Sequence, residues 1–389
     1  MQIRKDALNL YLEIFGEFWL SPVFWLVLFS MLGQMGLYLG LFRLMAYKKI
    51  NSIDDYGYNW PAVSIIICAR NEEANLLAFL PGILSQDYPE YEVIVVNDQS
   101  LDNTKYVLED LVMMHSKLKV VSLDEYLREF EGKKLALMLG FKRAAYDVLL
   151  LTDADCEPVG PNWVMHMMSG FQNDGTDLVL GVSPYFSKPG LLNALIQFDT
   201  CYTAIQYVSF ALLGNAYMGV GRNLAYRKSL FFNNKGFAPF QKLISGDDDL
   251  FVNRRANSTN TSIQLNSDSF TYSKPKQSWS EWFRQKTRHT HTGKYYKQKH
   301  KIQLYLVWFS HITFFISIPL AFVFLTWPLA LSIVFCRYCT SSIINYGMLR
   351  RMKLVKLLPF WPILEIIYLL VLLPSFSLIS WLTGKRNKW

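Results

Sequence analysis

Charged residues and informative cysteine patterns are scarce in this sequence. Asp, Glu, Lys and Arg make up 18% of the 389 residues, whereas about 25% is usual in a soluble domain. The five cysteines form neither a disulfide framework nor a zinc-ligand spacing. Cys336 and Cys339 do form a C-x-x-C pair, but it lies in an apolar run, which favours small hydrophobic residues over metal ligands. These absences exclude a disulfide-stabilised small domain and a zinc module.

Two common nucleotide-binding signatures are also missing. The sequence has no G-x-x-x-x-G-K-[ST] segment, and "GVGRNL" at 219–224 does not match a dinucleotide fingerprint. P-loop and Rossmann chemistry are therefore disfavoured. The net charge of +8 would suit nucleic-acid binding, but much of the basic excess lies beside apolar runs, where membrane topology or anionic lipid explains it more simply. We therefore expect no nucleic-acid partner.

Long apolar runs lie near both ends of the chain. Residues 22–42 and 302–335 carry no charge, and 357–383 contain only Glu365. Each run is long enough to cross a bilayer as a helix. Residues 302–335 are too many for one helix, so Pro319 or the segment "TWPL" should mark a hairpin. The expected organisation is an N-terminal segment (1–50) with one span at about 22–42, a middle domain (51–300), and a C-terminal membrane domain (301–389) with about three apolar segments.

Basic clusters next to the apolar runs predict the orientation. Lys and Arg gather at 42–49, 293–301 and 350–356, and the positive-inside rule places all three clusters, with residues 50–300, in the cytoplasm. The N-terminal run is long and no A-x-A-type site follows it, so we expect a retained anchor rather than a cleaved signal peptide. We expect an integral membrane protein, in a bacterial inner membrane, whose membrane lipids are a further partner.

The last apolar segment does not fit this rule if it crosses the bilayer fully. The closing "GKRNKW" would then lie outside the cytoplasm despite its charge. The segment could instead lie in the membrane interface or re-enter, bent by Pro359, Pro362 and Pro374. The sequence leaves these alternatives open.

The middle region alternates short apolar runs with amphipathic stretches. Continuous runs rich in Val, Ile and Leu are typical of parallel strands covered on both faces. A strand-helix-strand order implies one mostly parallel sheet in an α/β domain, with ligands at the carboxyl ends of its strands. The expected strands are 62–68, 91–96, 118–123 and 146–151, and the expected helices are 72–85, 102–116 and 133–145.

Acidic residues follow three of these strands. The strand ends carry "ARNEE" (69–73), "NDQS" (97–100) and "TDADC" (152–156). Each segment has a simpler interpretation as a turn or a helix cap, with Asn71 and Asp102 as good helix starts. Three acid-bearing loops at one edge of a sheet favour a ligand that binds carboxylates, such as a divalent cation with a phosphorylated substrate.

These segments, in this order, resemble the family 2 inverting glycosyltransferases of the GT-A fold, which include cellulose and hyaluronan synthases. The resemblance covers roughly 60–290 and the membrane layout. "NDQSLDNT" is similar to the family's D-D-x-S-x-D-x-T, with Asn97 in place of the first Asp, and "GKKLAL" (132–137) is similar to G-K-x-x-A-L. The resemblance implies a nucleotide-sugar donor, UDP- or GDP-linked, bound by Ala69, Arg70, Glu72, Asp98, Lys133 and Asp153.

The resemblance also implies a metal site and a general base. "DAD" at 153–155 matches the family's D-x-D, which makes Asp155, with Asp153, the expected ligand of Mg²⁺ or Mn²⁺ on the leaving diphosphate. "SGDDDLF" (245–251) resembles G-E-D-x-x-L, with Asp247 where Glu is usual and Asp248 at the position of the base. A simpler interpretation of this segment is a helix start capped by Ser245 or Asp247.

Two further segments carry expectations of different kinds. "WFRQKTRHTHTG" (282–293) resembles Q-x-x-R-W through Gln285, Arg288 and His289, with His in place of Trp. In the family this segment lines the acceptor channel and touches the diphosphate, as the Asp247 position also does. The alternative is a basic amphipathic helix lying on the membrane. "YVSFALLG" (207–214) could be a surface helix dipping into lipid or part of the core, and both interpretations stay open.

The expected function is therefore a membrane-integrated, metal-dependent, inverting glycosyltransferase. Its acceptor would be a lipid-linked saccharide or another glycan. One alternative is a processive polysaccharide synthase. An alternative of another class is a nucleotide-binding membrane scaffold or transporter, which we disfavour because the apolar runs, apart from Glu365, lack the buried ionisable residues that transport sites need.

Overall fold

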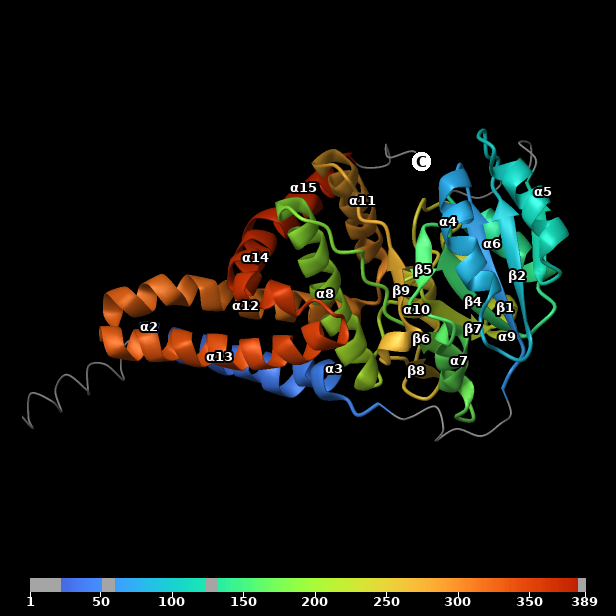
Figure 1. Cartoon of the computed structure of the whole chain (residues 1–389). Coiled ribbons are helices and arrows are strands. Elements are labelled where there is room, and N and C mark those ends of the chain that lie inside the picture. Colours follow the sequence, from blue (N-terminus) through green and yellow to red (C-terminus); the bar gives the residue numbers. More distant parts are fainter. Residues whose placement is uncertain (1–21, 51–59, 124–131, 384–389) are drawn as a thin grey trace, which may run out of the picture.

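The computed structural model of the chain describes residues 22–50, 60–123 and 132–383. A sheet with helices on both faces forms one end, and a bundle of long helices extends from the other (Figure 1). The closing "GKRNKW", on which the topology of the last apolar segment depends, lies outside the described residues.

The main sheet of the described residues has seven strands in the order β3-β2-β1-β4-β7-β6-β8. β1, β2, β3 and β4 are parallel, whereas β7 runs antiparallel to β4 and β6. The strands are β1 (Val63–Ala69), β2 (Tyr91–Asn97), β3 (Leu118–Ser122), β4 (Val148–Asp153), β6 (Leu178–Leu180), β7 (Leu224–Arg227) and β8 (Thr261–Ile263). β5 (Cys156–Pro158) and β9 (Thr271–Ser273) form a second, two-stranded sheet. The predicted α/β fold class is confirmed.

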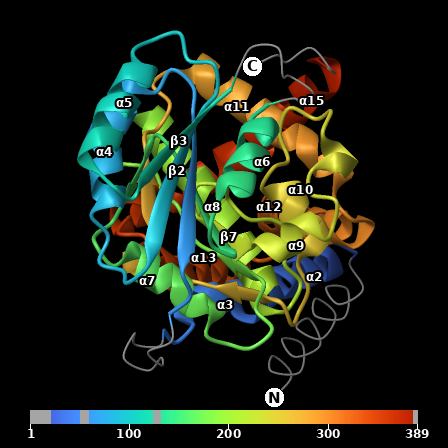
Figure 2. The same cartoon turned by 90° about the vertical axis from the view of Figure 1, so that its right-hand side faces the viewer.

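Alternate residues of the strands pack into two separate hydrophobic cores, one on each face of the sheet. This explains why the sequences of the strands are continuously apolar. Ile65 and Ile67 of β1 pack under α4 (Glu73–Leu84) and α5 (Thr104–Met114), with α7 (Trp163–Met168). Ile66 points to the opposite face, toward α6 (Lys134–Arg143). Figure 2 shows α4 and α5 on one side of the sheet and α6 on the other. Burial on both faces leaves no polar alternation in the strands.

The starts of α4 and α5 differ from the expected caps. The residues preceding these helices are Glu72 and Asn103, not Asn71 and Asp102. The Asp102 carboxylate accepts hydrogen bonds from the backbone N–H of Thr104 at 3.0 Å and of Glu73 at 3.3 Å. Asp102 therefore links the N-termini of α4 and α5. Local sequence could not predict this link, because Glu73 begins α4 whereas Asp102 lies in the loop before α5.

The remaining elements close the domain around the sheet. Residues 207–214 fall largely in α8 (Leu191–Leu212), where Tyr207, Val208, Phe210 and Ala211 are buried, so the core interpretation is confirmed. The other helices here are α9 (Lys228–Phe232), α10 (Asp249–Arg255) and α11 (Trp279–Thr292), and the short helical turns are η4 (Ser169–Phe171), η5 (Ala238–Phe240), η6 (Ser267–Ser269) and η7 (Gly293–Tyr295).

Four helical segments within the described residues are long and apolar enough to cross a membrane. The first comprises α2 (Pro22–Met35), η1 (Gly36–Phe42) and α3 (Arg43–Tyr47), and the next two are α12 (Gln298–Phe324) and α13 (Trp327–Arg351). The hairpin falls at "TWPL", because Pro319 lies inside α12. The fourth comprises η8 (Val355–Phe360), α14 (Trp361–Ile367), η9 (Tyr368–Leu372) and α15 (Leu373–Thr383).

The fourth segment takes a different direction from the other three. In Figure 1, α2, α12 and α13 lie side by side along the long axis, whereas α14 and α15 rise at an angle beside α8 and α11. α14 contacts α8, and α15 packs against α11. Its outer side stays apolar, with Ile363, Val371 and Trp381 exposed.

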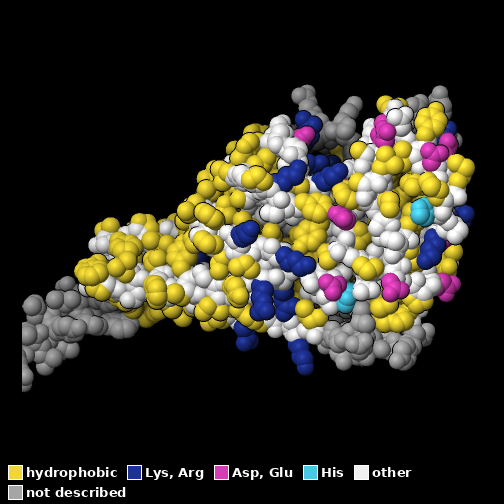
Figure 3. Space-filling model, in the orientation of Figure 1, with side chains coloured by type: hydrophobic (Ala, Val, Ile, Leu, Met, Phe, Trp, Pro, Cys, Tyr) yellow, Lys and Arg dark blue, Asp and Glu magenta, His cyan; other side chains and the backbone are white. Residues whose placement is uncertain are grey.

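Figure 3 shows an apolar surface along the bundle and dark blue Lys and Arg side chains where the bundle meets the sheet domain. The exposed basic residues that border the apolar helices come from all three clusters seen in the sequence. They are Arg43, Lys48, Lys49, Lys294, Lys297, Lys299, Arg350, Lys353 and Lys356.

A buried polar cluster joins all four apolar segments. Arg337 of α13 donates hydrogen bonds to Gln34 Oε1 at 3.0 and 3.1 Å and to Glu365 Oε1 at 2.8 Å. Tyr38 donates to the same Glu365 oxygen at 2.8 Å, and His311 Nε2 lies 3.3 Å from it. All five side chains are at most 1% exposed. The expectation that Glu365 is the only buried ionisable group of these segments is therefore wrong, because Arg337 lies just beyond the uncharged run and His311 within it.

Candidate active site

The twelve residues predicted from the sequence line one cavity of about 370 Å³. It lies where β1 and β4 meet, with Cys68 of β1 opposite Asp153 of β4. β2 lies on one side of β1 and β4 lies on the other, so the strand order reverses direction at β1. A reversal of this kind leaves a crevice at the carboxyl ends of the strands. These lining residues are Ala69, Arg70, Glu72, Asp98, Lys133, Asp153, Asp155, Asp247, Asp248, Gln285, Arg288 and His289.

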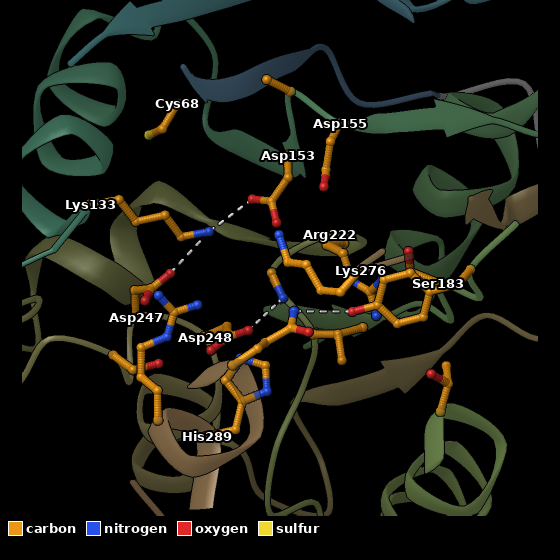
Figure 4. Close-up of a pocket in the computed structure, with 18 of the residues that line it drawn as sticks. Cys68, Lys133, Asp153, Asp155, Ser183, Arg222, Asp247, Asp248, Lys276 and His289 are labelled. Carbon is orange, nitrogen blue, oxygen red and sulfur yellow. Dashed lines mark hydrogen bonds and ion pairs between the residues drawn. The ribbon is translucent and has the colours of Figure 1, made fainter. Parts of the chain in front are cut away.

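Lys133 connects two of the acid segments. Its Nζ lies 2.8 Å from Asp153 Oδ1 and 3.3 Å from Asp247 Oδ2 (Figure 4). Burial alone would lower the pKa of Lys133, but the two carboxylates raise it well above its usual value. Lys133 in turn holds the pKa of Asp153 below its usual value, against the effect of burial. This ion-pair network keeps "GKK" and the two acidic loops together.

Within the described residues Asp155 forms no ion pair, although the charges of Arg222 and Lys276 partly lower its pKa. Figure 4 shows Asp153 and Asp155 side by side at one wall of the cavity. Burial, and then the charge of Asp153, raise the pKa of Asp155. Burial, with contributions from Asp155 and Asp153, also raises the pKa of Glu72. Excess negative charge at this wall would be relieved by a bound cation.

Among the described residues, no group of three or more His, Cys, Asp or Glu side chains is arranged to hold a metal by itself. The acidic residues therefore share a cavity without forming a complete coordination sphere of their own. Mg²⁺ commonly uses one or two protein carboxylates together with substrate phosphates and water. The "DAD" segment offers a carboxylate set of that kind.

Asp248 lies across the cavity from the "DAD" segment. Its Oδ2 accepts a hydrogen bond from the backbone N–H of Gly221 at 2.8 Å, and its Oδ1 accepts one from Asp249 N–H at 2.7 Å. Asp248 itself caps α10, in place of the expected Ser245 or Asp247. Burial, followed by the charges of Asp247 and Asp249, raises the pKa of Asp248 to about 7. A fixed carboxylate with this pKa can accept a proton near neutral pH.

The loop before Asp248 requires a glycine. Gly246 has φ +100°, and an added Cβ would lie 2.5 Å from Leu250. This left-handed conformation turns the chain so that Asp247 meets Lys133 while Asp248 meets Gly221.

α11 forms one wall of the cavity. Gln285, Arg288 and His289 line the cavity, and Gln285 donates a hydrogen bond to Tyr185 at 3.3 Å. On another side of α11, Trp282 is 1% exposed and packs on Phe376 of α15. The His289 side chain is exposed at the cavity wall, and the surrounding protein, followed by the charges of Lys286 and Arg288, lowers its pKa.

Sequence reasoning missed several residues of the cavity. Arg222 stacks on the Tyr185 ring at 4.2 Å, and its buried Nη1 has no hydrogen-bond partner within the part of the chain that the structure describes. Lys276 also lines the cavity, on the side opposite Lys133 in Figure 4. Lys286 pairs with Asp199 of α8 at 2.5 Å. Arg222 belongs to the quoted "GVGRNL", so its place before β7 was the one available signal.

Residues 64–232 match the model of the family Glycosyl transferase family 2. Residues 64–232 therefore form a family 2 glycosyltransferase domain, and its sheet is of the GT-A type.

Curated relatives agree with this class. The probable glycosyltransferase YdaM of Bacillus subtilis is 26% identical over 281 residues, which are 66% of this chain and 64% of that protein. The beta-monoglucosyldiacylglycerol synthase of a Nostoc species is 31% identical over 116 residues, 29% of this chain and 24% of that protein. The chain spans less than two thirds of the length of the curated relatives it matches.

A solved structure agrees in fold. The mannosyltransferase PcManGT from Pyrobaculum calidifontis, solved with GDP-Man and Mn²⁺, superposes with a TM-score of 0.51 at 16% identity, covering 88% of this chain and 98% of that one. At this identity the similarity supports the fold alone.

Proposed function

We propose that the protein transfers a sugar from a UDP- or GDP-sugar to a lipid-linked or glycan acceptor, with inversion at the anomeric carbon and with a divalent metal. The observation that carries this proposal is the position of Asp248. Its carboxylate shares one cavity with Asp153 and Asp155, and burial brings its pKa to about 7. The donor and Asp248 would then lie at opposite walls of the cavity. An inverting transfer requires this arrangement, because the base acts on the face of the anomeric carbon opposite the leaving group.

The donor would lie between the ends of β1 and β4. Arg70, Glu72 and Asp98 would contact the nucleoside, and Lys133 and Arg222 would face the diphosphate. A bound Mg²⁺ or Mn²⁺ at Asp155, with Asp153 beside it, would neutralise charge that develops on the leaving diphosphate. PcManGT was solved with GDP-Man and Mn²⁺, which supports a divalent metal without deciding between Mg²⁺ and Mn²⁺.

Asp248 would act on the acceptor. One oxygen is held by Gly221 N–H, so the carboxylate keeps its direction into the cavity. As the acceptor oxygen attacks the anomeric carbon, its proton moves to Asp248, the carbon–oxygen bond to the diphosphate breaks, and the bonding electrons leave with the diphosphate. Arg222, whose buried Nη1 lacks a partner among the described residues, would donate to a phosphate oxygen.

The apolar helices would anchor this site at the membrane surface. The basic residues at the junction favour a cytoplasmic sheet domain, and a cytoplasmic site would meet nucleotide sugars. We propose that α2, α12 and α13 span the bilayer while α14 and α15 lie in its interface. Placing the fourth segment there removes the conflict between "GKRNKW" and the positive-inside rule.

A panel experiment tests the proposed function. Purified protein in lipid nanodiscs would be incubated with UDP- and GDP-sugars, with Mg²⁺, with Mn²⁺ or with EDTA, and released nucleoside diphosphate would be measured. We expect release from at least one donor with metal and none with EDTA. A protein that releases nucleoside diphosphate from no donor under any condition would be a scaffold, and the proposal would be wrong.

Replacing Asp155 with Asn should weaken metal-dependent donor binding by at least about tenfold, because even changes to residues that only support metal ligands cost about 10 to 100-fold. The measurement is calorimetric titration of the accepted nucleotide sugar with and without Mn²⁺. Asp110→Asn, on the exposed surface of α5, is the matched control. Equal affinity in Asp155→Asn and the control would remove Asp155 from the proposed metal site.

The rate should depend on pH through Asp248. The base works deprotonated, so kcat/KM should fall about tenfold per pH unit below pH 7 and level off above it. The pKa of Asp248 is higher in the folded protein than in the unfolded chain. The folded state therefore loses stability as the pH rises from the pKa of the unfolded chain to about 7. Asp248→Asn should therefore melt no lower than wild type at pH 8. A kcat/KM that stays constant from pH 8 to pH 5 would contradict this role.

A further inference from the structure

A second cavity of about 300 Å³ adjoins the active-site cavity. Asp248, Lys286 and His289 line both. Asp248 therefore lies where the two cavities meet, whereas the acidic residues proposed for donor binding line only the first cavity. A molecule in the second cavity could present a hydroxyl to Asp248.

The rest of the second cavity is built from the apolar helices. Leu304 and Trp308 come from α12, and Leu373 and Phe376 come from α15. Its exposed lining is mostly apolar. On the outer sides of the same helices, Leu306 is 56% exposed and Leu378 is 56% exposed. The helices that wall the cavity thus also present apolar surface outward, which suits an amphipathic molecule arriving from lipid.

The charged residues that line the second cavity determine which kind of lipid headgroup it can hold. Among the described residues that line it, Lys286 is the one Lys or Arg, and it is already paired with Asp199 at 2.5 Å. His289 also lines the cavity. Asp248 and Asp249 contribute two carboxylates. A phosphorylated headgroup would bring negative charge toward these acids without a free cation to balance it.

Asp249 is fixed as part of the wall. It accepts hydrogen bonds from Thr292 at 2.5 Å and from Tyr296 at 2.8 Å. Tyr368 similarly donates to Asp199 at 2.5 Å. The hydroxyls of these aromatic side chains are therefore already used within the protein, which leaves mainly hydrocarbon to contact an incoming molecule and disfavours a hydrated polysaccharide.

We propose that the acceptor is an uncharged, hydroxyl-bearing lipid that enters from the membrane into the second cavity, between α12 and α15, and presents its hydroxyl to Asp248. This inference rests on the proposed function and narrows its acceptor to a neutral lipid. Its hydrocarbon chain would contact Leu304, Trp308 and Leu373, and no phosphate-binding cation is needed.

Photolabelling tests the inference without any donor. Protein in phosphatidylcholine nanodiscs would be exposed to a diacylglycerol that carries a diazirine in one acyl chain, and labelled peptides would be mapped by mass spectrometry. We expect labelling at Leu304–Trp308 and at Leu373–Phe376, with competition by unlabelled dioleoylglycerol. Undecaprenyl phosphate and the soluble sugar cellotetraose should not compete.

Matched variants separate the cavity from the outer helix surface. Leu373→Trp should fill the cavity and lower labelling and acceptor kcat/KM at least about tenfold, since single methylenes in apolar pockets already change selectivity by this order. Leu370→Trp, 42% exposed in the preceding turn, should match wild type. Leu304→Trp and Leu306→Trp on α12 provide a second pair. Melting temperatures and metal-dependent donor binding, measured on each variant, identify any that fail to fold.

The outcomes are distinct from those of the donor panel. Competition by undecaprenyl phosphate or cellotetraose that equals or exceeds that of dioleoylglycerol would overturn the neutral-lipid acceptor while leaving glycosyl transfer intact. Equal labelling in Leu373→Trp and Leu370→Trp would also overturn it. Failure of every nucleotide sugar in the panel would instead refute the proposed function itself.

Discussion

Replacing Asp248 with Asn should lower the transfer rate about a thousandfold, because general-base catalysis contributes roughly 10²- to 10⁴-fold. Asn keeps the size of the side chain and can still accept the hydrogen bond from Gly221 N–H, but it cannot take the proton of the acceptor hydroxyl. The measurement is the initial rate of product formation at saturating donor and pH 8, where the wild-type carboxylate is ionised.

The control for this substitution is donor binding. Asp248→Asn should bind the nucleotide sugar and metal as wild type does, since the proposed donor contacts lie at the opposite wall. Asp110→Asn on α5 should leave both rate and binding unchanged. Transfer by Asp248→Asn at a rate close to wild type would assign the base to another group.

Replacing Arg337 with Met should destabilise the helical bundle by about 3 kcal/mol, because removing one partner of a buried ion pair leaves the other charge uncompensated. Glu365 would lose its 2.8 Å partner, and Gln34 would lose two hydrogen bonds from the same guanidinium. The melting temperature in detergent should fall by about 5 °C. Arg350→Met, on the exposed surface of the same helix, is the matched control.

A double variant distinguishes loss of charge pairing from loss of packing. Arg337→Met combined with Glu365→Gln removes both charges and should recover most of the lost stability. A double variant that is less stable than Arg337→Met alone would show that packing, rather than an unpaired Glu365, sets the cost.

Local sequence was enough to predict the four parallel strands of the main sheet and the acidic residues at their ends. Continuous apolar runs predicted β1, β2, β3 and β4, and the rule that ligands meet strand ends predicted that Asp98 and Asp153 lie at one edge of the sheet. The resemblance added Asp248, which lies far along the chain from them. All these residues line one cavity, while their individual roles stay predictions.

Long-range pairing could not be predicted from the sequence. Arg222 and Lys286 occur in stretches with several basic residues, and nothing nearby shows that one stacks on Tyr185 and the other pairs with Asp199. Arg337 lies near the end of an apolar run, where its neighbours give no sign of a partner. Its partner Glu365 lies on another helix, so the cluster becomes visible only when the bundle is assembled.

The proposed reaction requires the donor and Asp248 to meet in one cavity. A crystal structure with Mn²⁺ and a non-hydrolysable analogue of the accepted nucleotide sugar tests this requirement most directly. We expect the metal against Asp155, the diphosphate near Lys133 and Arg222, and the anomeric carbon open to Asp248 on the face opposite the leaving group. A donor bound away from the "DAD" segment, or an anomeric carbon whose open face points away from Asp248, would contradict the account.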